Sequence, residues 1–198
     1  MAFLIDCLNI SIAANDEMPK EKNDKVLKIA IVGPECTGKS ELAEYLAKSF
    51  DNAWVEEYAR TYLNNLKRPY NETDLLRIAK GQIELEEKLA TKAKQVLICD
   101  TNLLVIKIWS EFKYGRCDKE ILNLIDAQSY DLHLLTNTDV PWEADNQREH
   151  PHRREELYEI YERELQSRNI RYIEISGTRA QRRSLAVQSI EALLKENE

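Results

Sequence analysis

Eight consecutive residues near the start of the chain have the types and spacing that hold a phosphate group. They match the pattern G-x-x-x-x-G-K-[ST] without a gap. Glycines let the backbone turn so that successive N–H groups point inward at phosphate oxygens. Lys39 is expected to reach the β- and γ-phosphates of ATP, and the Ser40 hydroxyl to bind magnesium. The ATP-binding residues predicted in this segment are Gly33, Pro34, Glu35, Cys36, Thr37, Gly38, Lys39, Ser40 and Glu41.

The residues on both sides of this loop support the same interpretation. A β-branched run at 26–32 predicts a strand that Gly33 ends, and the spacing of apolar residues predicts a helix from about Lys39 to Phe50. The amino end of that helix adds a favourable dipole for an anion. A chance glycine-rich turn is the alternative, and the flanking strand and helix disfavour it.

An acidic residue ends a second apolar run. Asp100 follows the predicted strand at 96–99, and a carboxylate at the end of a strand beside the phosphate-binding loop is typical of a magnesium site. The alternative is that Asp100 caps a helix that starts near Asn102. The magnesium ligands predicted from the sequence are therefore Ser40 and Asp100.

Another carboxylate follows the short strand predicted at 53–55. In open α/β sheets, ligands bind beyond the carboxyl ends of the strands, so Glu57 and Arg60 are expected beside a phosphoryl acceptor. A carboxylate there can orient the acceptor hydroxyl and take its proton, and either Glu57 or Asp100 can serve as that base. The alternative is a solvated helix start whose charges face water.

A segment after the fourth predicted strand has the composition of a lid. Residues 141–148 contain several charged residues and a tryptophan, and Arg148 is placed to clamp the transferring phosphoryl group. Closure of such a segment excludes water that would hydrolyse ATP. The catalytic residues predicted for the whole chain are Lys39, Asp100, Glu57 and Arg148.

The last predicted loop, residues 176–179, precedes the C-terminal helix and is expected to pack against adenine. Arg179 or Arg182 can stack on the base. A capped helix start with exposed arginines is the alternative interpretation. Both arginines are added to the predicted ATP-binding set.

These candidates need a scaffold of alternating strands and helices. Strands are predicted at 26–32, 53–55, 96–99, 132–135 and 170–175, and helices at about 39–50, 72–94, 153–167 and 180–194. The expected fold is α/β: a three-layer P-loop kinase fold with a mostly parallel five-stranded sheet and a short lid. Residues 1–25 are expected to form an N-terminal extension and linker, and residues 26–198 the P-loop kinase domain.

Bulk composition excludes several classes of protein. A net charge of −7 argues against sequence-independent binding of nucleic acid. No apolar run approaches the ~20 residues of a membrane span. The four cysteines lack the spacing of a zinc site or redox pair, which indicates reduced thiols in a cytoplasmic protein. A small-molecule substrate is therefore the expected partner, and the oligomeric state stays open.

These residues together resemble the ribosylnicotinamide kinase domain of NadR-type NAD-biosynthesis proteins. The resemblance runs from about Leu27 to Leu194 and rests on the phosphate-binding loop, on E-Y-x-R at 57–60, on D-T-N at 100–102 and on P-W-x-x-D-x-x-R at 141–148. It implies ATP and Mg²⁺ as cofactors and nicotinamide riboside as the acceptor, giving nicotinamide mononucleotide and ADP. The substrate-binding residues that it implies are Tyr58, Arg60, Asn102, Trp109, Trp142 and Asp145.

Two positions depart from the family pattern. Glu56 stands where relatives often carry tryptophan, and Asn102 replaces the second carboxylate of D-T-D. The charge of Glu56 is expected to attract a cationic pyridinium ring, as aromatic faces do. A kinase for another nucleoside, nucleotide or small acid is one alternative, and a regulatory ATP-binding module without metabolite kinase activity is another.

Overall fold

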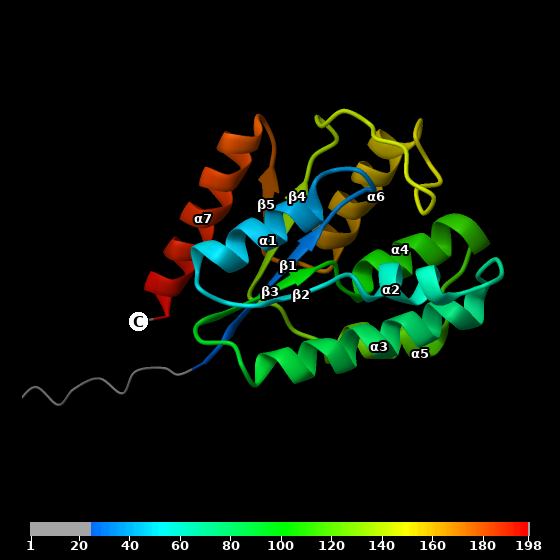
Figure 1. The fold of residues 1–198 in the computed structure, drawn as a ribbon, viewed down its shortest axis with the longest axis horizontal. Helices are drawn as coiled ribbons and strands as arrows, with labels where there is room; N and C mark the ends of the chain where they lie inside the picture. Colours follow the sequence, from blue (N-terminus) through cyan, green and yellow to red (C-terminus); the bar gives the residue numbers. More distant parts are fainter. Residues whose placement is uncertain (1–24, 198) are drawn as a thin grey trace, which may run out of the picture.

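A computed structural model describes residues 25–197, so the predicted N-terminal extension at 1–25 lies outside the described residues except for Lys25. Its centre is a single sheet of five parallel strands in the order β2-β3-β1-β4-β5 (Figure 1). The predicted sheet is confirmed. Its strands are β1 (Leu27–Val32), β2 (Trp54–Val55), β3 (Val96–Asp100), β4 (Leu132–Thr136) and β5 (Tyr172–Ile175).

The three middle strands are buried because helices cover both faces of the sheet. All five residues of β3 and all five of β4 are buried, as continuous apolar runs in parallel sheets normally are. The register pairs Ile31 of β1 with Asp100 of β3, and the Thr101 N–H donates to the Ile31 carbonyl at 3.0 Å. This register places Asp100 beside the start of the phosphate-binding loop.

The helices form a layer on each face of the sheet. α1 and α7 pack together on one face, and residues of α4 and α6 pack on the other (Figure 1). α3 covers β2 and β3, and α2 and α5 pack against α3 and α4. The helices are α1 (Lys39–Ser49), α2 (Tyr58–Asn65), α3 (Glu72–Ala90), α4 (Leu103–Tyr114), α5 (Lys119–Ala127), α6 (Arg154–Ser167) and α7 (Arg179–Glu196).

Three of these helices, α2, α4 and α5, are missing from the helices that the sequence predicts. α2 has 8 residues and α5 has 9, which is too short for an apolar stripe to stand out. α4 begins Leu-Leu-Val-Ile and packs against both the sheet and α3, so its sequence is apolar around most of its circumference. Because α4 is buried on two sides, it has no amphipathic pattern from which the sequence could predict a helix.

The state of the cysteines and the character of the helices can be compared with what the sequence predicts. Cys36, Cys99 and Cys117 are free thiols, and Cys7 lies outside the described residues. Within residues 25–197, no helix combines the length and the apolar character that crossing a bilayer requires.

A buried histidine joins β4 to the start of α4. His133 is 3% exposed, and its Nε2 lies 3.0 Å from the Asn102 side-chain nitrogen. The Asn102 side-chain oxygen accepts from the Leu104 N–H at 3.1 Å, so the amide nitrogen must be the donor toward His133. The neutral ring therefore accepts at Nε2 and carries its proton on Nδ1. Burial lowers the pKa of His133 to about 4.

This histidine makes stability depend on pH. Between about pH 6.5 and pH 4 the unfolded chain binds a proton at His133 that the folded chain excludes, so stability falls as the pH falls. Moving from pH 7.5 to pH 5.5 should cost the wild type on the order of 1 kcal/mol more than it costs His133→Gln. Urea unfolding at both pH values measures the difference. The exposed His152→Gln should behave like the wild type, and equal pH dependence in the wild type and His133→Gln would refute the assignment.

Candidate functional site

The phosphate-binding loop (P-loop), residues 33–40, lies directly against the end of β4. Gly33 has a φ of 137°, and a Cβ there would come within 2.6 Å of the Thr136 hydroxyl and 2.7 Å of the Thr136 carbonyl oxygen. Gly38 has a φ of 79° and is the N-cap of α1. Only glycine tolerates both the backbone conformation and the close approach at Gly33. Glycine is therefore favoured at the two positions for different reasons: close approach to Thr136 at Gly33, and the left-handed backbone of the N-cap at Gly38.

Lys39 lies across this loop. Its Nζ donates to the carbonyl oxygens of Gly33 at 3.0 Å and Pro34 at 2.6 Å. Burial lowers the pKa of Lys39, and the nearby carboxylates of Glu57 and Asp100 oppose that effect. The ammonium group is thus held at the centre of the loop, where a nucleotide phosphate is expected.

Asp100 presents a carboxylate suited to a hard cation. It is 2% exposed, and its Oδ1 has no hydrogen-bond partner. Burial and the nearby Glu57 raise the pKa of Asp100 to about 6, although the Ser40 hydroxyl and Lys39 act in the opposite direction. A buried carboxylate oxygen beside a serine hydroxyl is the oxygen donor set that magnesium prefers. The residues present therefore fit the ion.

Magnesium in such a site needs few protein ligands. No group of three or more His, Cys, Asp or Glu residues in the described chain is arranged to hold a metal alone. Mg²⁺ typically binds one or two carboxylates together with substrate phosphates and water. Ser40 and Asp100 therefore remain the predicted ligands.

Glu57, Arg60 and Asp145 form a chain of ion pairs. Arg60 Nε lies 3.5 Å from Glu57 Oε2, and Arg60 Nη1 lies 3.0 Å from Asp145 Oδ2. Glu57 is the N-cap residue of α2, and Asp145 belongs to the lid. Glu57 and Arg60 line the cavity described below, and Asp145 does not. Asp145 thus orients Arg60 from outside, although the family resemblance implied a direct substrate contact.

A cavity of about 960 Å³ extends on both sides of the P-loop. One end lies beyond β4 and β5 and is lined by residues such as Asp139, Gly177 and Arg179, and we call it the nucleobase compartment. The other end lies beyond β2 and β3, and we call it the acceptor compartment. The acceptor compartment is lined by Glu57, Ala59, Arg60, Leu63, Val105, Ile108, Trp109, Phe112, Leu157 and Tyr161.

Aromatic side chains make up much of the acceptor compartment. Trp109, which the resemblance implied, lines it from α4, and Tyr70 packs on Trp109 with ring centroids 4.9 Å apart. The sequence did not identify Phe112 and Tyr161. Phe112 lies three residues after Trp109, which puts both on one face of α4. Tyr161 comes from α6, and only the fold brings it here.

The predicted lid, residues 141–148, lies in the segment between β4 and α6, and this segment contacts the P-loop at two of the motif's variable positions. The Glu35 carboxylate accepts from the Glu149 N–H at 2.9 Å and from the His150 N–H. The Cys36 sulfur accepts from the Glu143 N–H at 3.1 Å and from Arg148 Nη1 at 3.3 Å. The predicted clamp, Arg148, therefore lines the cavity above the P-loop.

Three residues predicted to contact the substrate do not line the cavity, so their substrate contact stays a prediction. Asn102 is buried and caps α4 with its side-chain oxygen, which also leaves Asp100 free of a capping role. Tyr58 packs over Gly81 of α3, where a Cβ would approach the ring to 2.1 Å. Trp142 lies near the guanidinium groups of two arginines and is absent from the cavity wall. Glu56 is exposed and does not line the cavity either.

The two arginines predicted at the adenine loop differ in their surroundings. Arg179 is exposed on the cavity wall, and its guanidinium donates to Glu41 at 3.0 Å. Arg183, a neighbour that the sequence analysis passed over, also donates to Glu41. Arg182 also lines the cavity, but it is only 7% exposed and its guanidinium donates to backbone carbonyls. Stacking on adenine therefore stays a prediction for Arg179 or Arg182.

Comparison with known proteins agrees with this geometry. A family model described as an AAA domain matches residues 28–183. The chain therefore belongs to this family of P-loop domains.

The chain is also similar to NadR proteins, both in sequence and in structure. The trifunctional NAD biosynthesis/regulator protein NadR of Escherichia coli (strain K12) is 30% identical over 129 residues, which are 62% of this chain and 31% of that protein. The chain thus spans about a third of the length of this curated relative. The solved structure of a NadR protein in complex with NR has a TM-score of 0.74 at 19% identity, covering 86% of this chain and 52% of the other. The resemblance stated from the motifs is confirmed.

A kinase structure shows the same fold across almost its whole length. Thymidylate kinase from Candida albicans has a TM-score of 0.62 at 14% identity, covering 87% of this chain and 94% of the kinase. The predicted P-loop kinase fold is confirmed by this likeness and by the parallel sheet.

The two carboxylates in the site predict different defects when neutralised. Asp100→Asn should raise the magnesium concentration needed for half-maximal rate as well as lower the rate, because it removes the buried anionic ligand. Glu57→Gln should leave ATP affinity nearly unchanged and lower kcat by roughly 10²-fold, because it removes a base. Steady-state rates across magnesium and ATP titrations separate these effects.

Glu56→Gln is the matched control for this pair, because Glu56 adjoins Glu57 but faces solvent. Its kinetics should equal those of the wild type. Loss of ATP–magnesium binding in Glu57→Gln but not in Asp100→Asn would reverse the two roles.

Proposed function

We propose that this chain transfers the γ-phosphoryl group of ATP to nicotinamide riboside, giving nicotinamide mononucleotide and ADP. The observation that carries the proposal is the convergence of Lys39, Asp100 and Glu57 between the P-loop and the aromatic acceptor compartment. These side chains come from α1, β3 and the start of α2. The family of the chain and its NadR relative support the same reaction.

Each group has a role in phosphoryl transfer. The P-loop N–H groups and Lys39 hold the β- and γ-phosphates. Ser40 and Asp100 hold magnesium, which, when bound, neutralises charge on the phosphates. Glu57, aligned by its ion pair with Arg60, orients the acceptor hydroxyl and takes its proton. Arg148 reaches from the lid toward the transferring group.

The acceptor compartment suits a cationic ring. Nicotinamide riboside carries a permanent positive charge on its pyridinium, which aromatic faces and nearby carboxylates attract. Trp109, Phe112 and Tyr161 supply aromatic surface, and Glu57 and Glu35 supply negative charge on the same cavity. Glu56 does not add to this attraction, because its side chain is exposed and does not line the cavity.

A kinase for an uncharged nucleoside or a nucleotide is the second candidate. The fold likeness to thymidylate kinase supports this class. The two candidates differ in the charge of the acceptor ring, so a direct substrate comparison separates them.

The kinase reaction itself depends on Lys39. Lys39→Ala should lower kcat by roughly 10²-fold or more, because a preorganised positive charge on the phosphates is lost. The coupled formation of ADP measures turnover, and circular dichroism checks the fold. Lys48→Ala, at an exposed position near the end of the same helix, should leave the rate unchanged. Near-normal turnover by a folded Lys39→Ala protein would sink the kinase proposal.

The preferred acceptor should be the charged riboside. Nicotinamide riboside should show a kcat/KM roughly two- to thirtyfold above that of its uncharged reduced form, because a cation–π contact contributes about 0.5–2 kcal/mol. Uridine, adenosine and thymidylate complete the panel under identical ATP and magnesium. Equal turnover of the charged and uncharged ribosides would refute the electrostatic argument. Acceptor-independent ADP formation, or none at all, would favour a regulatory ATP-binding module.

A further inference from the structure

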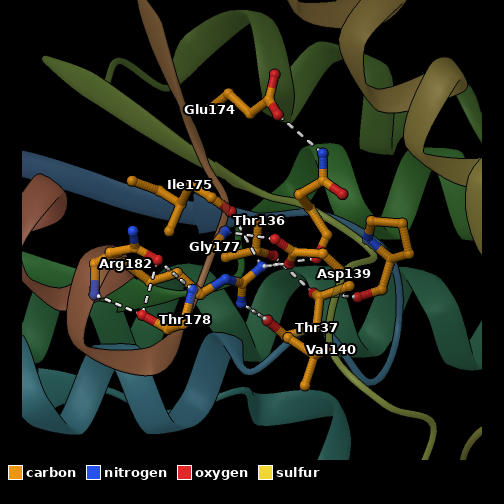
Figure 2. Close-up of polar contacts among 12 residues, drawn as sticks. Thr37, Thr136, Asp139, Val140, Glu174, Ile175, Gly177, Thr178 and Arg182 are labelled. Carbon is orange, nitrogen blue, oxygen red and sulfur yellow. Dashed lines mark hydrogen bonds and ion pairs between the residues drawn. The ribbon is translucent and has the colours of Figure 1, made fainter.

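One buried arginine connects three separate parts of the nucleotide site. The Arg182 side chain is 8% exposed, and its guanidinium lies at the centre of a group of oxygens (Figure 2). Nη1 donates to the Thr37 carbonyl at 2.7 Å. Nη2 lies 2.7 Å from the Asn137 carbonyl, 3.0 Å from the Ile175 carbonyl and 2.9 Å from Asp139 Oδ1. One guanidinium therefore contacts four oxygens that belong to three separate segments of the chain.

The positions of these oxygens define what Arg182 holds together. Thr37 is part of the P-loop, Asn137 directly follows β4, and Ile175 ends β5. The guanidinium also packs against the P-loop itself, because a Cβ on Gly38 would lie 3.6 Å from Nη1. Arg182 thus fixes the P-loop relative to the ends of the two strands that border the nucleobase compartment.

The carboxylate partner of Arg182 extends this network into the nucleobase compartment. Asp139 Oδ2 accepts from the Gly177 N–H, while Oδ1 contacts Arg182 (Figure 2). Asp139, Gly177 and Thr178 all line the cavity. Both Asp139 oxygens are occupied by protein donors, so the carboxylate acts within the wall of the compartment.

We propose that Arg182 is a positioning residue for ATP, which joins the P-loop to the wall of the nucleobase compartment. This inference rests on the proposed function in taking ATP as the nucleotide. Nη1 and Nη2 of this buried guanidinium are paired, whereas Nε has no partner among the described residues. Loss of the paired oxygens would leave a buried charge unsatisfied, so these oxygens keep their positions. The phosphate-binding N–H groups and the base-binding loop are then held at a fixed spacing before ATP arrives. Preorganisation of this kind raises affinity by lowering the ordering cost of binding.

Replacement of Arg182 should weaken nucleotide binding and spare the acceptor. In Arg182→Met, the dissociation constant of the magnesium complex of AMP-PNP should rise on the order of tenfold or more, because hydrogen bonds from a charged group are lost. Arg182→Lys should show a smaller rise, since its single ammonium keeps the charge but cannot span the same oxygens. Nicotinamide riboside affinity should change less than about twofold in both variants. Isothermal titration calorimetry measures both ligands, and circular dichroism checks the fold.

Arg171→Met is the matched control. Arg171 also pairs with a carboxylate through two hydrogen bonds, to Glu196, but it is exposed and lies outside this cavity. Its replacement should leave both affinities unchanged. Equal weakening of both ligands by Arg182→Met, or wild-type affinity for AMP-PNP in the folded variant, would overturn the positioning role. A wild-type protein that binds neither ligand would sink the proposed function instead.

A second variant tests the same network if the Arg182 variants do not fold. The Asp139 side chain is 33% exposed, so Asp139→Asn disturbs little packing while it removes the charge facing Arg182. Its AMP-PNP affinity should fall about three- to tenfold, with riboside affinity unchanged. Unchanged AMP-PNP affinity in Asp139→Asn would overturn the proposal.

Discussion

The whole site depends on one close contact between the P-loop and the neighbouring strand. Gly33 passes so near the end of β4 that a Cβ would come within 2.6 Å of the Thr136 hydroxyl. That hydroxyl donates to the Val32 carbonyl at 3.1 Å and lies 2.7 Å from the Thr37 hydroxyl. The contact sets the height of the P-loop above the sheet. The position of the phosphate-binding N–H groups therefore depends on packing of the P-loop against the end of β4, as well as on the conformation of the loop itself.

The same edge of the sheet concentrates opposite charges. Lys39 and Arg60 lie among Asp100, Glu57 and Glu35. Burial disfavours the charged forms of two of these groups: it lowers the pKa of Lys39 and raises the pKa of Asp100. A divalent cation beside Asp100 would reverse the effect of burial there, because it favours the ionised carboxylate. Phosphate oxygens would do the same for Lys39. The site would thus stabilise a metal–nucleotide complex, because each charged part of that complex would lie beside a protein group of opposite charge.

Sequence reasoning succeeded where contacts are local and failed where they are long-range. The P-loop and the Asp100 strand end follow from residues adjacent in the chain, so motif spacing predicts them. The side chains of Tyr58 and Asn102 are oriented by contacts with residues far away in the chain, which motif spacing does not reveal. Tyr58 meets Gly81 of α3, and Asn102 meets His133 of β4. Arg182 likewise contacts segments far away in the chain, and no spacing rule signals that.

The lid is connected to the phosphate site through positions that the P-loop motif leaves free. Glu35 accepts from two N–H groups just after the lid, and Cys36 accepts from Arg148 and from the Glu143 N–H. Lid position and P-loop conformation therefore cannot change independently. Arg148 is held beside the loop by a sulfur and a carbonyl oxygen, which are weaker partners than a phosphoryl oxygen. A bound γ-phosphate would compete with these partners for the guanidinium, so the same set of contacts would link phosphate binding to the exclusion of water.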